Sequence, residues 1–196
     1  AADHFEFVAQ SSKVTGYDHA AAAFWAARSN MTGQRPERVN RWLEMAAAQP
    51  RTFYGIIARR WLGEKSPFDW EPPVLTADRL ERVTTQKAGR RALALLEAGL
   101  DVRAGRELRF MSGGRDRELT KALIAMADKL SLPMASYRAG AALLGRDETL
   151  PASALYPLPQ WKPREGFRVD RALIFAFMRQ ESAFNVRARS SAGARG

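Results

Sequence analysis

Apolar residues recur every three or four positions along most of this chain, and glycine or proline interrupts each run after a few turns. One such stripe, with a proline after it, consists of Val39, Trp42, Leu43, Ala46 and Pro50. This spacing places apolar side chains on one face of an amphipathic helix. No useful length of sequence alternates with the period of two that marks a half-buried strand. The chain is therefore predicted to be all-α.

Capping residues and breakers predict where the helices begin and end. Asp18 precedes an alanine-rich helix that ends at Gly33, and Thr52 caps a helix that closes at Gly63. A loop rich in proline is predicted over 64–75. After this loop, one helix is predicted to start at Thr76 or Asp78, and the next to cover 86–98 with Leu93, Leu96 and Leu100 on one face. A third is predicted to start at the cap Asp101 and to stop at Gly113 and Gly114. A fourth carries the stripe Leu119, Leu123 and Met126, and a fifth is predicted to cover 134–144, before Gly145.

Short antiparallel helices in series are typical of stacked hairpins that build a solenoid, so residues 1–150 are predicted to form an irregular helical superhelix. Residues 151–168 differ because they hold Pro151, Pro157, Pro159 and Pro163. Helix does not persist through that density of proline. We expect 151–168 to be an irregular linker that packs through Tyr156 and Trp161, and 169–196 to belong to another domain.

The formal net charge is +10, from 31 Lys and Arg against 21 Asp and Glu, which favours anionic partners such as an acidic polymer. Most arginines stand singly between apolar residues, as on solvated helix faces. The chain has no cysteine, and its two histidines lie far apart, so neither a metal site nor a cofactor is expected. The N-terminal residues do not form a signal peptide, and no apolar run reaches membrane-spanning length.

The last predicted helix begins at the N-cap Asp170, passes through a continuously apolar stretch over 172–178, and ends near Glu181. We expect this helix to be buried. The negative end of the helix dipole, and partial burial beside Phe184, would both disfavour a charged carboxylate and suit Glu181 to act as a general acid. From these local features alone, an ordinary exposed glutamate at a helix end is the favoured interpretation.

The wider sequence favours the first interpretation. Residues 178–185 read Met-Arg-Gln-Glu-Ser-Ala-Phe-Asn, and a Ser-x-x-Gly turn over 190–193 follows. This arrangement closely resembles the first motif of the soluble lytic murein transglycosylases, and residues 42–55 resemble the helical superhelix that precedes it. Val186 stands where that family commonly has proline. The sequence ends at Gly196, where the family's Gly-Leu-Met-Gln would begin, so the second and third motifs are expected beyond it.

The resemblance implies that 169–196 contain the first helix of a lysozyme-like domain. It implies Glu181 as the catalytic acid/base, Ser190 as the residue that orients the carboxylate, and Ser182 as support for the turn. The implied enzyme is a periplasmic lyase that cleaves the β-1,4 bond between N-acetylmuramic acid and N-acetylglucosamine in peptidoglycan, with a 1,6-anhydro product. Peptidoglycan strands and other cell-wall proteins are the expected partners, without a cofactor or nucleic acid.

Two alternatives remain open. A non-enzymatic helical scaffold that binds a protein partner or peptidoglycan would account for residues 1–150 without using Glu181. Nucleic-acid binding would account for the net charge of +10 and for Arg187, Arg189 and Arg195. It ranks lower, because these arginines belong to no recognised nucleic-acid module.

Overall fold

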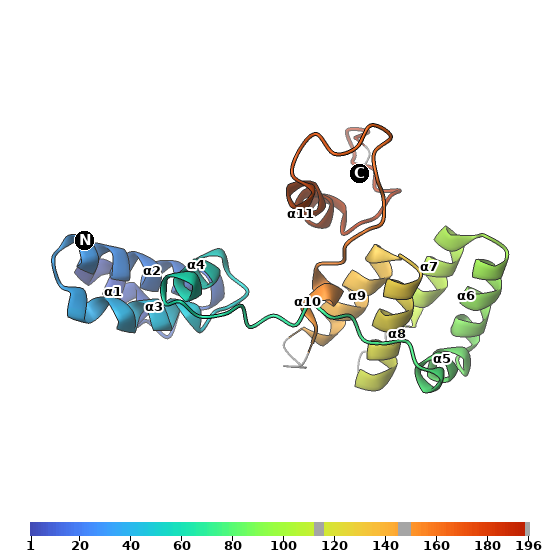
Figure 1. Ribbon diagram of the computed structural model, residues 1–196, viewed down its shortest axis with the longest axis horizontal. Coiled ribbons are helices and arrows are strands. Elements are labelled where there is room, and N and C mark those ends of the chain that lie inside the picture. Colours follow the sequence, from blue (N-terminus) through green and yellow to red (C-terminus); the bar gives the residue numbers. More distant parts are fainter. Residues whose placement is uncertain (112–115, 145–149, 195–196) are drawn as a thin grey trace. The chain divides into compact units, whose positions relative to one another are not determined.

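Helices are the regular secondary structure of the part of the chain that the computed structural model describes, residues 1–111, 116–144 and 150–194. The prediction of an all-α chain is confirmed. Two compact units divide the chain, Ala1–Pro67 and Phe68–Gly196 (Figure 1). The division falls inside the proline-rich loop that the sequence predicts over 64–75. The domain boundaries expected near 150 and 168 stay predictions.

The first unit is a small bundle around one apolar core. Its helices are α1 (Ala2–Ala9), α2 (Gly16–Thr32), the 3-10 helix η1 (Pro36–Arg38), α3 (Val39–Ala47) and α4 (Phe53–Trp61). The stripe predicted on α3 is buried throughout, and Trp42 at its centre has no exposed surface. Truncating such a tryptophan to alanine typically costs about 3–5 kcal/mol, so α3 anchors this unit.

Two sets of polar contacts hold helices of the first unit in place. The hydroxyl of Thr52 accepts a hydrogen bond from the backbone N–H of Gly55, 3.0 Å away, which confirms the predicted cap of α4. The helix α1, which the sequence pattern did not indicate, is held by a buried polar pair. Asn30 donates from Nδ2 to Oε1 of Glu6 at 2.7 Å, and Arg38 pairs with the same carboxylate at 3.0 Å.

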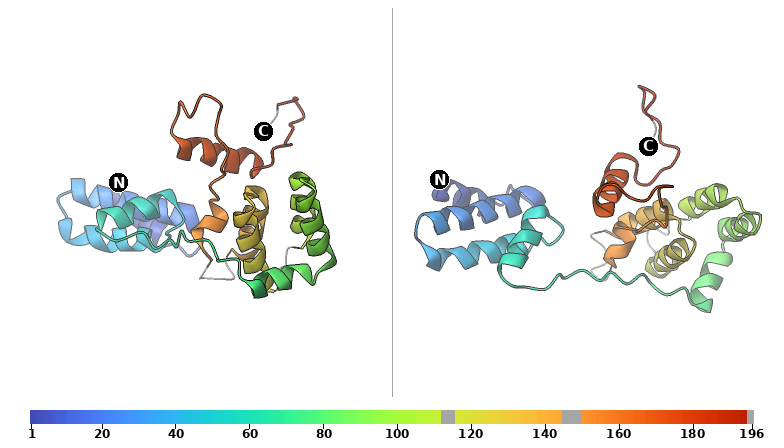
Figure 2. Two further views of the ribbon diagram at one scale, coloured as in Figure 1. Left: turned by 45° about the vertical axis from the view of Figure 1, so that its right-hand side comes forward. Right: turned by 45° about the horizontal axis from the view of Figure 1, so that its top comes forward.

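The second unit is built around α8, which is buried on nearly every side. Its helices are α5 (Ala77–Thr84), α6 (Lys87–Glu97), α7 (Asp101–Phe110), α8 (Arg117–Lys129), α9 (Pro133–Leu143), α10 (Ala152–Leu155) and α11 (Arg171–Ser182). The residues of α8 over 122–127 are all buried, as is Leu119, so the predicted stripe on this helix is confirmed. A helix that is apolar around its whole circumference belongs in the centre of a core. The views in Figure 2 show α5 to α9 of this unit from two further directions.

Four predictions of detail need correction. Helix α2 begins at Gly16 with Thr15 at the N-cap position, so Asp18 lies in its first turn and does not precede it. The predicted face of α6 does not extend to Leu100, which is 40% exposed because the chain turns at the left-handed Gly99 before reaching it. Asp101 is the first residue of α7 rather than its cap, since Leu100 holds the N-cap position. The segment 150–168 is not irregular throughout, because α10 forms directly after Pro151, where a proline is compatible with a helix start.

Other predictions fall outside the described residues. The helix stops expected at Gly113, Gly114 and Gly145 lie in 112–115 and 145–149. Within the described ranges, no helix has both the length and the apolar character needed to cross a membrane.

The helix α11 begins as predicted and is much less buried than predicted. The carboxylate of Asp170 accepts a hydrogen bond from the N–H of Ala172 at 2.7 Å, which caps the helix. Within α11 only Phe175 is buried, while Leu173 and Phe177 are 50% and 60% exposed. The expectation that α11 passes through a core is therefore wrong for the described residues. The continuous apolar run predicts burial on all faces of α11, because it covers its whole circumference. In the structure only one face of α11 packs against other residues.

Candidate functional site

Glu181 lies in the last turn of α11 with its side chain exposed. It has no hydrogen-bond or ion-pair partner among the described residues. An unpaired carboxylate at a helix C-terminus faces the negative end of the helix dipole. The predicted position of Glu181 on the helix is thus observed, whereas the predicted burial beside Phe184 is not.

An exposed apolar stripe on α11 leads to this carboxylate. Leu173, Phe177 and Glu181 are four residues apart in succession, so they follow one another along the same side of the helix. The two apolar members keep half or more of their surface in contact with solvent. Any surface or ligand that covers this stripe also removes water from around Glu181.

The backbone after Glu181 turns through two consecutive left-handed residues. Ala183 and Phe184 have φ values of 49° and 61°. The N–H of Ala183 donates to the carbonyl of Arg179 at 3.0 Å, and that of Phe184 donates to the carbonyl of Met178 at 3.2 Å. These bonds satisfy carbonyls at the end of the helix. Left-handed conformation is unfavourable for residues with a side chain and often occurs at functional sites.

Burial of Phe184 offsets part of this strain. The ring is 3% exposed and meets Tyr137 of α9 edge to face, with 6.4 Å between the centroids. An aromatic ring buried in this way contributes apolar burial and a favourable ring contact. The turn that follows Glu181 is therefore held in place by the helical part of the same unit.

The two serines named from the sequence have different surroundings. Ser182 donates its hydroxyl hydrogen to the carbonyl of Met178 at 3.0 Å, within its own helix. Ser190 lies in an exposed turn, where its hydroxyl oxygen accepts from the N–H of Ala194 at 3.1 Å. The Gly193 in this turn has a φ of 85°, as the Ser-x-x-Gly pattern requires. Neither serine has a hydrogen bond to Glu181 among the described contacts.

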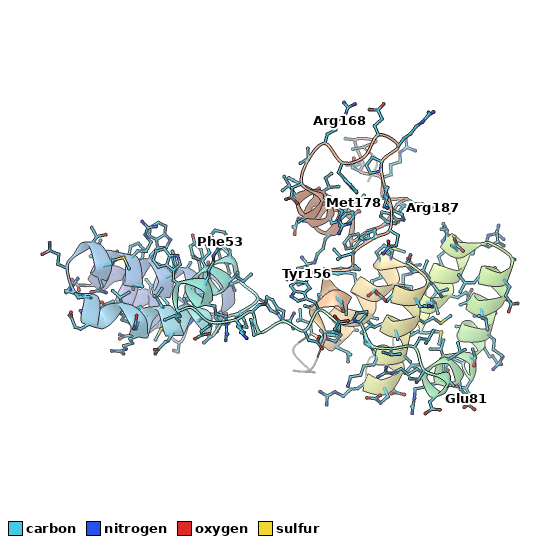
Figure 3. The ribbon with its side chains drawn as sticks, in the orientation of Figure 1. Phe53, Glu81, Tyr156, Arg168, Met178 and Arg187 are labelled. Carbon is cyan, nitrogen blue, oxygen red and sulfur yellow. The ribbon has the colours of Figure 1, made fainter. Side chains whose placement is uncertain are left out.

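Arg179 connects α11 to the helices below it, although the sequence gives it no role beyond its place in the motif. Its Nε donates to the carbonyl of Leu155 at 2.9 Å. Its guanidinium carbon lies 4.6 Å from the ring centroid of Tyr156 and 5.1 Å from that of Tyr137. A planar guanidinium suits such stacking, which a lysine cannot reproduce. Tyr156 is labelled in Figure 3, as are Met178 and Arg187 of the α11 region.

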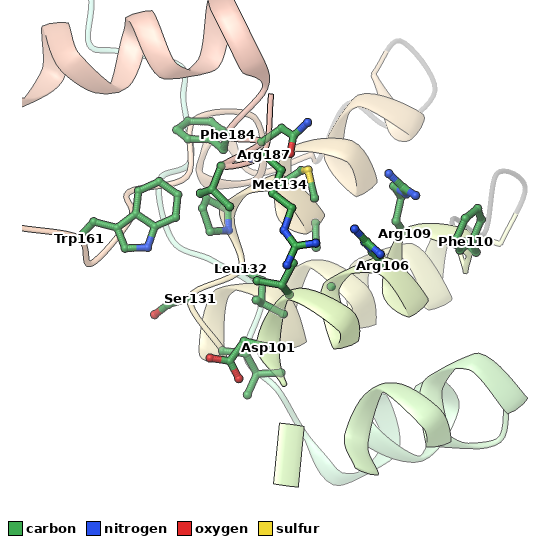
Figure 4. Close-up of a pocket in the computed structure, with 17 residues that line it drawn as sticks. Asp101, Arg106, Arg109, Phe110, Ser131, Leu132, Met134, Trp161, Phe184 and Arg187 are labelled. Atoms are coloured by element: carbon green, nitrogen blue, oxygen red, sulfur yellow. Dashed lines mark hydrogen bonds between the residues drawn. The ribbon is translucent and has the colours of Figure 1, made fainter. Parts of the chain in front are cut away.

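A cleft of about 720 Å³ lies beside the turn, within the second unit. Its walls are α7, the start of α9, Trp161 and the loop over 184–187 (Figure 4). Glu181 does not line it. The cleft therefore adjoins the end of the motif, at Phe184 and Asn185, and the carboxylate of Glu181 is not part of its wall.

Comparison with known proteins finds a match in structure. No protein-family model and no curated protein sequence matches the chain. Its fold is similar to the crystal structure of an inactive Glu-to-Gln mutant of the lytic transglycosylase Slt from Pseudomonas aeruginosa, with a TM-score of 0.63 and 22% identity. The likeness is one of fold.

The match is extensive for this chain and partial for the other protein. It covers 90% of this chain and 29% of the Slt chain, so the sequence spans less than a third of that protein's length. The all-α fold of a lytic transglycosylase is shared at this level of identity.

Proposed function

We propose that this protein is a lytic transglycosylase that cleaves peptidoglycan glycan strands, with Glu181 as its acid/base. The observation that carries this proposal is the position of Glu181. It is exposed and has no ion-pair or hydrogen-bond partner among the described residues, in the last turn of α11, inside the 178–185 motif and just before the strained turn at Ala183 and Phe184. The fold shared with Slt supports the same reading, and that protein's structure is described as inactive with a glutamate replaced by glutamine.

The reaction needs one carboxyl group in two protonation states. The protonated carboxyl of Glu181 gives its proton to the oxygen of the β-1,4 bond, and the bond between C1 of the muramic acid and that oxygen breaks. Positive charge develops at C1, where the N-acetyl oxygen of the substrate can stabilise it. The carboxylate of Glu181 then takes the proton of the 6-hydroxyl group, whose oxygen bonds to C1. The product is a 1,6-anhydro ring, and no water is consumed.

The resemblance assigns supporting roles to two serines that follow Glu181 in the sequence. The hydroxyl oxygen of Ser190 accepts from Ala194, which leaves the hydroxyl hydrogen to donate to a carboxylate. Its proposed role is to orient Glu181. Ser182 supports the turn through its bond to the carbonyl of Met178. A glycan strand laid along Leu173 and Phe177 would exclude water from around the carboxylate.

The substrate also fits the charge of the chain. The formal net charge is +10, and peptidoglycan carries carboxylates on its lactyl groups and stem peptides. The proposed location is the bacterial cell envelope, where this polymer is found. Peptidoglycan is the proposed partner, and the reaction as written uses no cofactor.

The product distinguishes this function from its competitors. The full encoded protein is incubated with purified peptidoglycan sacculi, and the released muropeptides are analysed by mass spectrometry. A lytic transglycosylase yields anhydro ends, which are lighter by one water than the reducing ends that a hydrolase yields. Binding to sacculi without release of either product would favour the scaffold alternative.

A further inference from the structure

The cleft beside the turn is not used by the proposed chemistry, and its walls carry an excess of positive charge. Arg106 and Arg109 lie three residues apart on α7, on neighbouring positions of one helix face. Arg187 extends into the cleft from the loop that follows α11 (Figure 4). Asp101 is the acidic residue of the lining, so three arginines face one carboxylate.

These arginines have no neutralising partner in the described part of the chain. None of the three forms an ion pair there, and the guanidinium of Arg109 lies over the ring of Phe110, 4.9 Å from its centroid. A contact with a ring leaves the positive charge in place. Like charges gathered around one cleft repel each other, so binding of an anion there is favourable. The forked geometry of arginine matches a carboxylate well.

Much of the remaining lining is apolar, with Ser131 and Asn185 as its polar members. Phe110 is 75% exposed, Val186 is 56% exposed and Trp161 is 36% exposed. Leu132 and Met134 line the same cleft. Exposed apolar side chains next to unpaired arginines suit a ligand that carries both carboxylates and hydrocarbon groups. A free inorganic anion would leave these apolar walls in water.

The start of α9 also favours an anionic ligand in the cleft. This helix has 11 residues, and Pro133 and Met134 of its first turn line the cleft. The N-terminus of a helix carries partial positive charge and favours anions close to it. The partial positive charge of the helix N-terminus and the positive charges of the arginines therefore both favour an anion in this cleft.

We propose that this cleft binds a short peptide bearing carboxylates and, resting on the function proposed above, that this peptide is the stem peptide of peptidoglycan. Phe184 and Arg187 line the cleft and belong to the loop that leaves the helix end holding Glu181. A stem peptide is attached to the muramic acid on which Glu181 would act. Its capture in the cleft would therefore hold the glycan strand near the carboxylate and select strands that keep their peptides.

The direct test measures binding of a synthetic stem tetrapeptide to the full encoded protein by isothermal titration calorimetry. The probes for comparison are the same peptide with its carboxylates amidated and a peptide-free N-acetylglucosamine oligomer. Amidation is expected to weaken binding at least about tenfold, because the charge-assisted hydrogen bonds are lost. The double change Arg106→Gln with Arg109→Gln, and Arg187→Gln alone, are each expected to weaken binding of the natural peptide to a similar degree.

A matched control comes from the same helix. Arg103 lies one turn before Arg106 on α7 and does not line this cleft. Arg103→Gln removes one positive charge from the same helix and is expected to change the affinity for the peptide by less than about twofold. Circular dichroism of each variant checks that the helical fold is retained.

Three results would overturn the proposal. They are equal affinity for the natural and the amidated peptide, unchanged affinity in the Arg106 and Arg109 double variant, and tighter binding of a DNA oligonucleotide than of the peptide. Failure of the proposed function has a different signature. A protein that binds the peptide through these arginines and releases no anhydro product would contradict the catalytic assignment alone.

Discussion

The guanidinium group of Arg179 lies 4.6 Å above the ring centroid of Tyr156, and its Nε donates to the carbonyl of the preceding Leu155. This contact joins α11 to the end of α10, inside the segment 151–168 that the sequence suggests as a linker. The turn of α11 that carries Glu181 is therefore held by a residue two positions before it. In the proposed reaction Arg179 would act as a positioning residue, because its contacts hold the helix end that carries Glu181.

Replacing Arg179 is expected to loosen α11 without unfolding the unit. Arg179→Ala removes a charge-assisted hydrogen bond and two ring contacts, together about 1–3 kcal/mol of local stability. Arg179→Lys keeps the charge and should restore little of it, because lysine lacks the planar fork. Hydrogen exchange of the α11 amides measures the effect. Arg168→Ala, which removes an exposed ion pair with Glu165, is the control and should leave these amides unchanged.

Two glycines inside neighbouring helices should respond in opposite ways to alanine. A Cβ at Gly89 would lie 1.9 Å from the carbonyl oxygen of Val83, so Gly89→Ala should lower the free energy of unfolding by more than about 2 kcal/mol. A Cβ at Gly105 would meet nothing closer than Leu132, 4.0 Å away. Gly105→Ala should therefore raise stability by about 0.5–1 kcal/mol. Urea denaturation of the two variants gives both values, and equal effects would contradict the packing described here.

The left-handed turn after Glu181 makes a prediction about glycine. Ala183 has a φ of 49°, which glycine adopts without strain. Ala183→Gly should stabilise the end of α11 by up to about 1 kcal/mol, after allowing for the greater freedom of glycine in the unfolded chain. Ala176→Gly, at an ordinary and exposed position of the same helix, should destabilise by about 1 kcal/mol. Destabilisation by Ala183→Gly would contradict the observed backbone.

The two serines near Glu181 should differ in their effect on activity. Ser190→Ala removes a hydroxyl group whose hydrogen remains able to donate, and should lower the release of anhydro-muropeptides by about tenfold. Ser182→Ala should cost less, since that hydroxyl group already donates to the carbonyl of Met178. Initial rates on purified sacculi give the order. A larger loss in Ser182→Ala than in Ser190→Ala would reverse the proposed roles.

Much of the fold could be predicted from local signals. The stripe centred on Trp42, the cap at Thr52, the stop at Gly33 and the cap at Asp170 all follow from spacing and capping chemistry, which act within a few residues. Packing between segments far apart in the sequence is harder to predict from these local signals. The apolar run of α11 indicates a helix buried on all sides, yet Leu173 and Phe177 are exposed in this chain. Apolar composition reports that a side chain favours burial and does not report which surface covers it.

The candidate site also has a part that local sequence signals predict and a part that they do not. The motif places Glu181, Ser182 and Ser190 at their positions on the helix end and in the turn, because that geometry is local. The contact of Arg179 with Tyr137 and Tyr156, and the assembly of the arginine-lined cleft, depend on segments far apart in the sequence. One arginine among many gives no local sign that it meets two aromatic rings.

The most direct test of the central claim is the release of anhydro-muropeptides by Glu181→Gln in the full encoded protein. The amide is nearly isosteric with the carboxyl group, so the variant should keep the helical circular dichroism spectrum and the binding to sacculi. It can neither give a proton to the glycosidic oxygen nor take one from the 6-hydroxyl group. Loss of general acid/base catalysis typically costs about 10²–10⁴-fold in rate, and in the proposed reaction one residue serves both steps.

Mass spectrometry of the soluble products from purified sacculi gives the answer. The account predicts anhydro ends from the unmodified protein and a loss of rate at or beyond the upper end of that range for Glu181→Gln. Release of anhydro products by the variant at a rate near that of the unmodified protein would show that Glu181 is not the catalyst.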